Sequence, residues 1–301
     1  MPAALTGQLA RSPLETVRVE ESQRELRSGD RVNWIELHVE TPGQGTNSTV
    51  TCEYYPHSAQ RAPVILILPM AGGDYPVERY FARYFSRHGF AAMILHRRKF
   101  PHESTLEEIN PWIVASVQDA QRALDWVQTR PELDPQRLAI FGISTGGLKG
   151  TLLTALDPRV KAAALGLAGS DLPYILTHSA EPKITRLRER LLREKGMTLP
   201  QLEAYLRHII QWDPGQVGDY VDCDRVLLVI ARFDHVIPFR KGWELRDRLG
   251  RPETLLLPTG HYSAALCIPC IELQSLRFFE RKLRMAPVPS GRLRSPKDTG
   301  P

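Results

Sequence analysis

The sequence predicts an α/β fold in which a mostly parallel sheet carries helices on both faces. Short, continuously apolar runs such as Ala62–Pro69 are typical of strands that are covered on both faces. These runs alternate along the chain with amphipathic segments of helical period, such as Trp112–Arg130. This alternation builds parallel sheets with helices on both faces. The chain has 301 residues, of which 42% are hydrophobic, and can therefore bury a substantial core without disulfide bonds.

The elements follow in a regular order. Residues 1–30 show no clear periodicity and are expected to form an arm. Val32–Glu40 and Thr49–Tyr55 alternate apolar and polar residues around a turn-rich segment, which predicts two antiparallel strands at the start of the sheet. About eight strands are expected in all, by the usual strand signals. The later strands are Ala62–Pro69, Phe90–Leu95, Arg137–Gly142, Val160–Gly169, Arg225–Arg232 and Glu253–Pro258; the helices are Val77–Gly89, Trp112–Arg130, Gly147–Leu156, Gly242–Leu249 and Ser263–Leu283.

A long insertion interrupts this order between Asp171 and Asp222, where two amphipathic helical segments replace any strand pattern. Such an insertion is either a functional lid or an idle decoration. We expect a helical cap (171–222) within an α/β domain that spans residues 31–285. The side chains expected to face the sheet or the pocket are Leu187, Leu191, Leu202, Tyr205, Leu206 and Ile209.

The formal charge of +5 lies in the C-terminal segment. From Arg281 onward there are six basic residues and one acidic residue, so the preceding chain is neutral. A disordered, solvated tail over 286–301 is expected in preference to a docking segment, and no nucleic-acid partner is expected. No apolar run reaches the ~20 residues of a membrane span, and the N-terminus lacks the apolar core of a secretory signal. We therefore expect a cytoplasmic protein without a membrane span.

Four cysteines are present, and two of them, Cys267 and Cys270, form a C-x-x-C pair. Zinc needs further ligands, and no second pair exists in the sequence. The pair also lacks the usual setting of a redox motif, the start of the first helix of a small domain. Buried packing cysteines are the favoured interpretation.

The segment "GISTG" (Gly142–Gly146) lies between a predicted strand and a predicted helix. This G-x-S-x-G pattern is weak alone but much stronger in that context, where it forms a sharp turn that exposes the serine. Gly142 and Gly146 satisfy the need for small residues where strand and helix crowd together. Ser144 is therefore a candidate nucleophile.

A serine hydroxyl needs a base, and the base must be held in the right tautomer. Asp234 directly follows one buried strand and His261 follows the next. The carboxyl ends of parallel strands meet at one edge of the sheet, so Ser144, Asp234 and His261 are expected to meet there. His235 adjoins the acid, but no strand end places it opposite Ser144.

The motifs "GISTGG", "ARFDHVIP" and "PTGHYS", in this order, resemble the α/β-hydrolase superfamily from about Val32 to Leu283. The nearest group is the serine esterase type, similar to dienelactone hydrolases and carboxylesterases, although dienelactone hydrolases use a cysteine nucleophile. The resemblance implies an oxyanion hole built from the N–H of Thr145 and an N–H of the loop "PMAGGD". That second donor is Ala71 or Met70, and the choice stays open because the loop departs from the family's His-Gly-x-Gly pattern.

Together these features predict a hydrolase that cleaves carboxylic esters through an acyl-enzyme, with a small-molecule acyl substrate and no metal or cofactor. A thioesterase or a peptidase on the same triad is the alternative, since leaving-group choice depends on pocket shape. A non-catalytic binding protein that retains the fold is a weaker alternative. The segment "HRRKF" (His96–Phe100) follows a strand and could present cations to an acidic substrate, but a solvated loop is favoured. The sequence does not predict the acyl preference or the oligomeric state.

Overall fold

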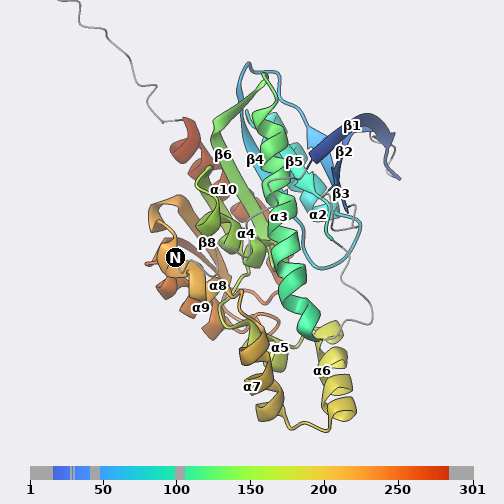
Figure 1. Cartoon of the computed structure of the whole chain (residues 1–301). Coiled ribbons are helices and arrows are strands. Elements are labelled where there is room, and N and C mark those ends of the chain that lie inside the picture. Colours follow the sequence, from blue (N-terminus) through green and yellow to red (C-terminus); the bar gives the residue numbers. More distant parts are fainter. Residues whose placement is uncertain (1–15, 28, 30, 41–47, 99–105, 285–301) are drawn as a thin grey trace, which may run out of the picture.

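The computed structural model of the chain describes residues 16–27, 29, 31–40, 48–98 and 106–284. Within these ranges a single sheet has nine strands in the order β1-β2-β3-β5-β4-β6-β7-β8-β9 (Figure 1). The first three strands and the β3–β5 pair are antiparallel, and all later neighbours are parallel. The predicted fold class is therefore confirmed. The strands are β1 (Thr16–Glu25), β2 (Arg31–Glu40), β3 (Ser48–Tyr55), β4 (Ala62–Leu68), β5 (Ala91–Leu95), β6 (Leu133–Ile143), β7 (Val160–Gly166), β8 (Val226–Ala231) and β9 (Glu253–Leu257).

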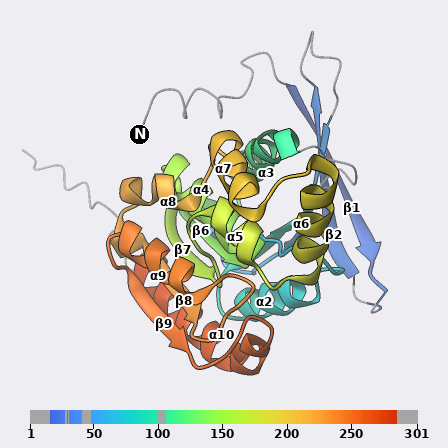
Figure 2. The same cartoon turned by 90° about the horizontal axis from the view of Figure 1, so that it is seen from below.

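Helices cover both faces of the sheet (Figure 2). Alternate residues of β4 enter two separate cores, because successive side chains of a strand point to opposite faces. Leu66 packs in the core under α3 and α4, whereas Ile67 packs with Phe81 and Phe85 of α2 on the other face. No helix within the described ranges is long and apolar enough to cross a membrane. The main helices are α2 (Pro76–Arg87), α3 (Ile109–Gln128), α4 (Thr145–Leu156), α9 (Phe239–Arg248) and α10 (Ile268–Phe279).

Strand β1 lies inside the segment that the sequence predicts to be an arm. It pairs with β2 from Thr16 opposite Glu40 to Glu25 opposite Arg31, and every one of its residues is exposed. With neither face buried, β1 has no need for an apolar side, so it leaves no periodic signal in the sequence. This strand raises the count from the expected eight to nine. The tail predicted over 286–301 lies outside the described residues.

The cysteine prediction is wrong for Cys270. Its side chain is exposed in the first turn of α10, and Cys267 is only partly buried. Ile271, Phe278 and Phe279 form the buried side of this helix instead. All four cysteines are free thiols, and Cys52 in β3 is the one that is fully buried.

Between β7 and β8 the chain forms α5 (Leu172–His178), α6 (Pro182–Lys195), α7 (Leu199–Ile209) and α8 (Pro214–Val217). Helices α5, α6 and α7 group at one end of the sheet (Figures 1 and 2). Leu191, Leu202 and Leu206 belong to the main core, and they line a small apolar hollow together with Leu106 and Ile109. Leu187, Tyr205 and Ile209 pack against the same core.

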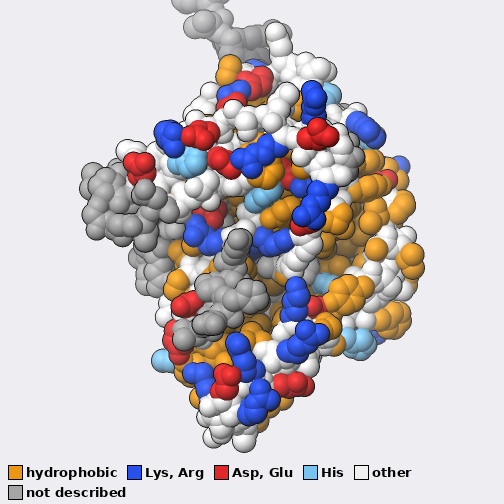
Figure 3. Space-filling view, turned by 90° about the vertical axis from the view of Figure 1, so that its right-hand side faces the viewer, with side chains coloured by type: hydrophobic (Ala, Val, Ile, Leu, Met, Phe, Trp, Pro, Cys, Tyr) orange, Lys and Arg blue, Asp and Glu red, His pale blue; other side chains and the backbone are white. Residues whose placement is uncertain are grey.

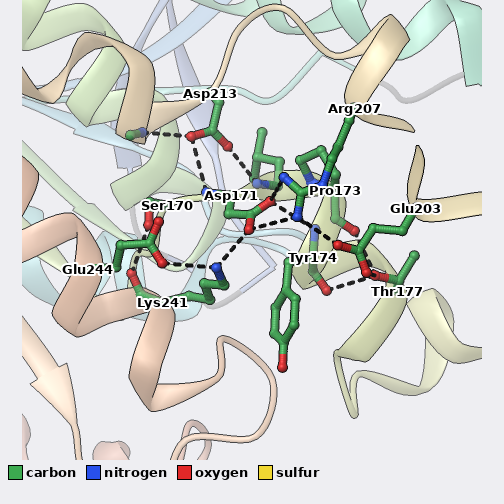
Figure 4. A network of polar contacts seen from close by, with 12 residues as sticks. Ser170, Asp171, Pro173, Tyr174, Thr177, Glu203, Arg207, Asp213, Lys241 and Glu244 are labelled. Carbon is green, nitrogen blue, oxygen red and sulfur yellow. Dashed lines mark hydrogen bonds and ion pairs between the residues drawn. The ribbon is translucent and has the colours of Figure 1, made fainter. Parts of the chain in front are cut away.

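A partly buried polar network links the start of this insertion to Asp213, which follows α7 (Figure 4). Asp171, which caps α5 with a positive φ of 63°, accepts hydrogen bonds from Lys241 Nζ at 2.6 Å and from Arg207 at 2.8 Å. Between α7 and α8, the carboxylate of Asp213 accepts from the Asp171 backbone N–H at 3.1 Å. Burial raises the pKa of Asp213, although hydrogen bonds from backbone N–H groups oppose the shift. The start of the insertion is thus hydrogen-bonded to Asp213 and Arg207, and Lys241 links it to α9.

Candidate active site

Ser144 occupies the corner between β6 and α4. Its φ of 56° and ψ of −121° lie in a region that non-glycine residues rarely adopt, and such strain is typical of functional turns. A Cβ atom at Gly142 would lie 2.4 Å from the Gly146 carbonyl oxygen, and one at Gly146 would lie 2.2 Å from the Leu68 carbonyl oxygen. Both positions therefore require glycine, as expected for a tight strand-to-helix corner.

Asp234 and His261 lie within hydrogen-bond distance of one another and of this serine. Asp234 follows β8 and is 4% exposed, and its Oδ1 accepts from the backbone N–H groups of Val236 and Ile237, each at 2.8 Å. Its Oδ2 lies 2.7 Å from His261 Nδ1, and His261 Nε2 lies 3.1 Å from Ser144 Oγ. The structure thus brings together the three side chains that the sequence singles out, in one chain of hydrogen bonds.

His235 has a different environment. It is exposed, and its backbone carbonyl accepts from Ala180 N at 2.8 Å, in the segment that leads into α6. Through this hydrogen bond, His235 links the loop after β8 to the insertion.

The loop after β4 carries the two candidates for the second donor of the oxyanion hole, Met70 and Ala71, and their backbone N–H groups differ in their partners. Met70 N–H donates to the buried Glu78 carboxylate at 2.8 Å, and Gly72 N–H donates to the Met70 carbonyl at 3.1 Å. Ala71 N–H has no hydrogen-bond acceptor among the described residues. Gly72 and Gly73 have φ angles of 148° and 74°, which favour glycine in this loop.

The buried carboxylate of Glu53 stabilises the same loop through its hydrogen-bond partners. Glu53 on β3 is fully buried and accepts from His96 Nε2 at 2.9 Å and from the Arg79 guanidinium at 2.6 Å. Burial alone would raise its pKa, but the hydrogen bonds from His96 and Arg79 outweigh burial and lower the pKa of Glu53 to about 2. Arg79 also donates to the Asp74 carbonyl, and His96 stacks on Tyr75, so the network reaches the far end of the loop.

The ionisation of Glu53 makes the free energy of unfolding depend on pH in the acid range. Because the folded-state pKa of Glu53 lies below its ordinary value of 4.5, its ionised form stabilises the fold above about pH 4.5, and this contribution is lost as the pH falls toward 2. The shift corresponds to about 3 kcal/mol. In thermal unfolding, Glu53→Gln is expected to have a lower Tm than the parent at neutral pH and a flatter fall in Tm across this acid window. Parallel Tm curves for the two proteins would contradict the assignment.

Arg97 and Arg98 are not the solvated residues that the sequence favours. Arg97 Nη1 donates to the Gly72 carbonyl at 3.0 Å, and its guanidinium lies 4.7 Å from the centre of the Tyr75 ring. Arg98 forms a two-point contact with Asp119 on α3, at 2.8 and 2.9 Å. Arg97 therefore helps to hold the loop after β4, while Lys99 and Phe100 lie outside the described residues.

Lys149 is a buried cation that sequence reasoning missed. It lies on α4, five residues after Ser144, is 7% exposed, and places Nζ 5.4 Å from the centre of the Trp112 ring. Burial lowers the pKa of Lys149 to about 8, although the charge of Asp119 opposes the shift. A lysine in a helical pattern normally predicts an exposed side chain, so the sequence carries no signal for this burial.

One cluster among the described residues has the spacing of a metal site. The ligand atoms of Glu20, Glu36 and His38 lie within 4.8 Å of one another on β1 and β2. Three strands separate this cluster from β6, and the Glu36 carboxylate already accepts from Arg24 and Trp34. The cluster therefore plays no part in the arrangement around Ser144.

Comparison with solved structures identifies the fold. The chain is similar to an acetyl xylan esterase from a Paenibacillus species, with a TM-score of 0.62, 20% identity and coverage of 93% of this chain and 92% of that one. It is also similar to the α/β-hydrolase GrgF from a Penicillium species, with a TM-score of 0.59, 16% identity and coverage of 89% and 99%. The chain therefore has the α/β-hydrolase fold. The position of Ser144 at the strand-to-helix corner is the usual place of the nucleophile in an α/β-hydrolase.

Sequence comparison adds two curated proteins that are similar to this chain. A thiohydrolase from Eupenicillium brefeldianum is 23% identical over 246 residues, which cover 66% of this chain and 79% of that protein. The thiohydrolase apmlB from Arthrinium phaeospermum is 28% identical over 119 residues, and the match spans only 38% of this chain and 37% of that protein. No family model matches the chain.

Proposed function

We propose that the protein is a serine hydrolase that cleaves a carboxylic ester or thioester through an acyl-enzyme. The observation that carries this proposal is the hydrogen-bonded chain from Asp234 through His261 to Ser144 at the strained corner. Esterases among the similar structures support the reaction class, and the thiohydrolase names of the two sequence relatives favour a thioester as the second candidate substrate.

Acylation follows from these contacts. Ser144 Oγ attacks the carbonyl carbon of the substrate, and His261 Nε2 accepts the hydroxyl proton. Asp234 holds the imidazole with Nδ1–H toward its carboxylate and stabilises the imidazolium that forms. When the tetrahedral intermediate collapses, the bond to the leaving group breaks and His261 returns the proton to that group. Water then attacks the acyl-enzyme with His261 as its base, which releases the acid and restores Ser144.

The negative oxygen of each intermediate needs two N–H donors. Thr145 N–H, at the start of α4, supplies one, and the positive end of the helix dipole adds to it. For the second we propose Ala71 rather than Met70, because the Met70 N–H already donates to Glu78. One such donor contributes about 2.7–4 kcal/mol to transition-state stabilisation.

We further propose that residues 171–222 form a cap over Ser144. The start of α6 supports this role, because it lies between the loops that carry the site: Glu181 contacts the hydroxyl of Tyr262, next to His261, and Ala180 contacts the loop of Asp234. Substitutions at the apolar positions of α6 and α7 are then expected to change acyl-chain preference.

Covalent labelling tests the proposed function directly. A fluorophosphonate is expected to label the parent protein at Ser144, since it reacts with a serine that has an active base, and Ser144→Ala is expected to show no labelling and no turnover of p-nitrophenyl esters. The change removes one oxygen at a corner held by Gly142 and Gly146, so the fold should be kept, which circular dichroism can check. A Ser144→Ala variant that retained parental turnover would exclude the proposed nucleophile.

A further inference from the structure

Helix α6 carries a row of basic side chains. Its fourteen residues include six Lys or Arg and two Glu, a net charge of +4. Lys183, Arg186, Arg190 and Arg193 recur at intervals of three and four residues, so they lie along one side of the helix. Blue side chains gather on the lower part of the molecule in Figure 3, on the face where α6 lies in Figure 1.

These cations are poorly neutralised. Lys183, Arg186 and Arg193 are exposed, and no carboxylate of the described residues lies within ion-pair distance of them. Arg190 reaches only Glu194, at 4.0 Å, and Glu189 and Glu194 are the two acidic residues of the helix. Like charges at such spacings repel, so the row is unfavourable for the isolated helix and is relieved by a bound anion.

The row begins at the candidate oxyanion loop. Lys183 Nζ lies 3.8 Å from the position that a Cβ atom on Gly72 would occupy. Arg97, from the core, donates to the carbonyl of the same glycine. Two cations from different parts of the chain thus meet beside Ala71, and the rise of an α-helix places Arg193 about 15 Å farther along.

This layout suits a ligand with several negative charges at a distance from its reacting carbonyl. A single carboxylate needs one cation, whereas four along ~15 Å of helix match a chain of phosphates, and arginine binds phosphate with two parallel hydrogen bonds. Coenzyme A has this form, since a neutral pantetheine arm separates its thiol from its phosphates.

We infer that the basic row of α6 binds the phosphates of a phosphopantetheine-type leaving group, so that the substrate is a coenzyme A thioester. The inference rests on the proposed function. Ser144 Oγ forms the acyl bond, the C–S bond breaks, and the thiol leaves with the proton from His261. Water then hydrolyses the acyl-enzyme, so that one thioester and one water give one acid and one free thiol.

The test compares four thioesters of the same acyl group, on coenzyme A, 4′-phosphopantetheine, pantetheine and N-acetylcysteamine. The parent is expected to show a higher kcat/KM for the coenzyme A thioester than for the pantetheine thioester by about tenfold or more, and salt should reduce this preference. The result with the 4′-phosphopantetheine thioester shows which phosphate of coenzyme A is responsible for the preference. In Lys183→Met and in the double variant Arg186→Gln/Arg193→Gln the preference should fall to near one, mainly through KM.

Lys161→Met is the matched control. Lys161 lies at the N-terminal end of β7, whereas the insertion that carries α6 follows the C-terminal end. Its side chain donates to the Pro158 carbonyl, so its loss should leave the preference unchanged. Equal kcat/KM of the parent for the coenzyme A and pantetheine thioesters would overturn the inference. So would a parent that cleaves p-nitrophenyl esters but no thioester, and in both cases the serine hydrolase would stand. If the parent cleaved none of the thioesters and no p-nitrophenyl ester, the result would instead contradict the proposed function.

Discussion

Replacing His261 by alanine is expected to lower kcat on an ester by about 10⁴- to 10⁶-fold, the loss typical of removing the base of a serine triad. His261 contacts both Ser144 Oγ and the Asp234 carboxylate. In the proposed mechanism it is the base that accepts the Ser144 proton, so the variant lacks that base. Steady-state kinetics of the purified variant on p-nitrophenyl esters measures the loss.

His235→Ala is the matched control for this variant. His235 directly follows Asp234 in the sequence but is exposed, and among the described residues only its backbone carbonyl forms a hydrogen bond. Because alanine keeps that carbonyl, kcat should stay close to the parental value. An inactive His235→Ala beside an active His261→Ala would reverse the assignment of the base.

Replacing Asp234 by asparagine is expected to reduce kcat by about 10⁴-fold with the geometry intact. Oδ1 of Asp234 accepts two backbone N–H groups, so in the variant the amide oxygen must take that position. The amide nitrogen then faces His261 Nδ1 and donates to it. The imidazole is forced to carry its proton on Nε2, toward Ser144, where it can no longer accept one.

The tautomer argument gives this prediction a second readout. The variant should keep a Tm near that of the parent, because both backbone hydrogen bonds survive, and its imidazole nitrogens should show the exchanged tautomer by ¹⁵N NMR. Retention of kcat within about tenfold of the parent would show that the orienting role of Asp234 is wrong, since each tenfold step is only ~1.4 kcal/mol of barrier.

The sequence predicts those elements of the fold that have at least one buried face. Continuously apolar runs predict the central strands, and the glycines at 142 and 146 predict the corner because the backbone there has no room for a Cβ atom. Asp234 and His261 are predictable for a topological reason, since both directly follow buried parallel strands and such strand ends share one edge of the sheet.

The parts that do not follow are set by tertiary contacts. Strand β1 is exposed on both faces and Lys149 is buried on a helix, so each contradicts the pattern that its residues suggest. The choice between Ala71 and Met70 depends on Glu78, eight residues beyond Met70, and the support of the loop depends on Glu53, on a strand two places away in the sheet from β4. No local period encodes these contacts.

The hydrogen bond between Asp171 and Asp213 has a consequence for how this protein can change. Asp171 and Asp213 are 42 residues apart in the chain, yet a hydrogen bond links them. The segment between them therefore leaves the sheet domain and returns to the same point. A change in its length or composition should leave the positions of β7 and β8 unchanged. Recombination at these two points would replace α5, α6 and α7, with the basic row of α6, while Ser144, Asp234 and His261 stay at the ends of their strands.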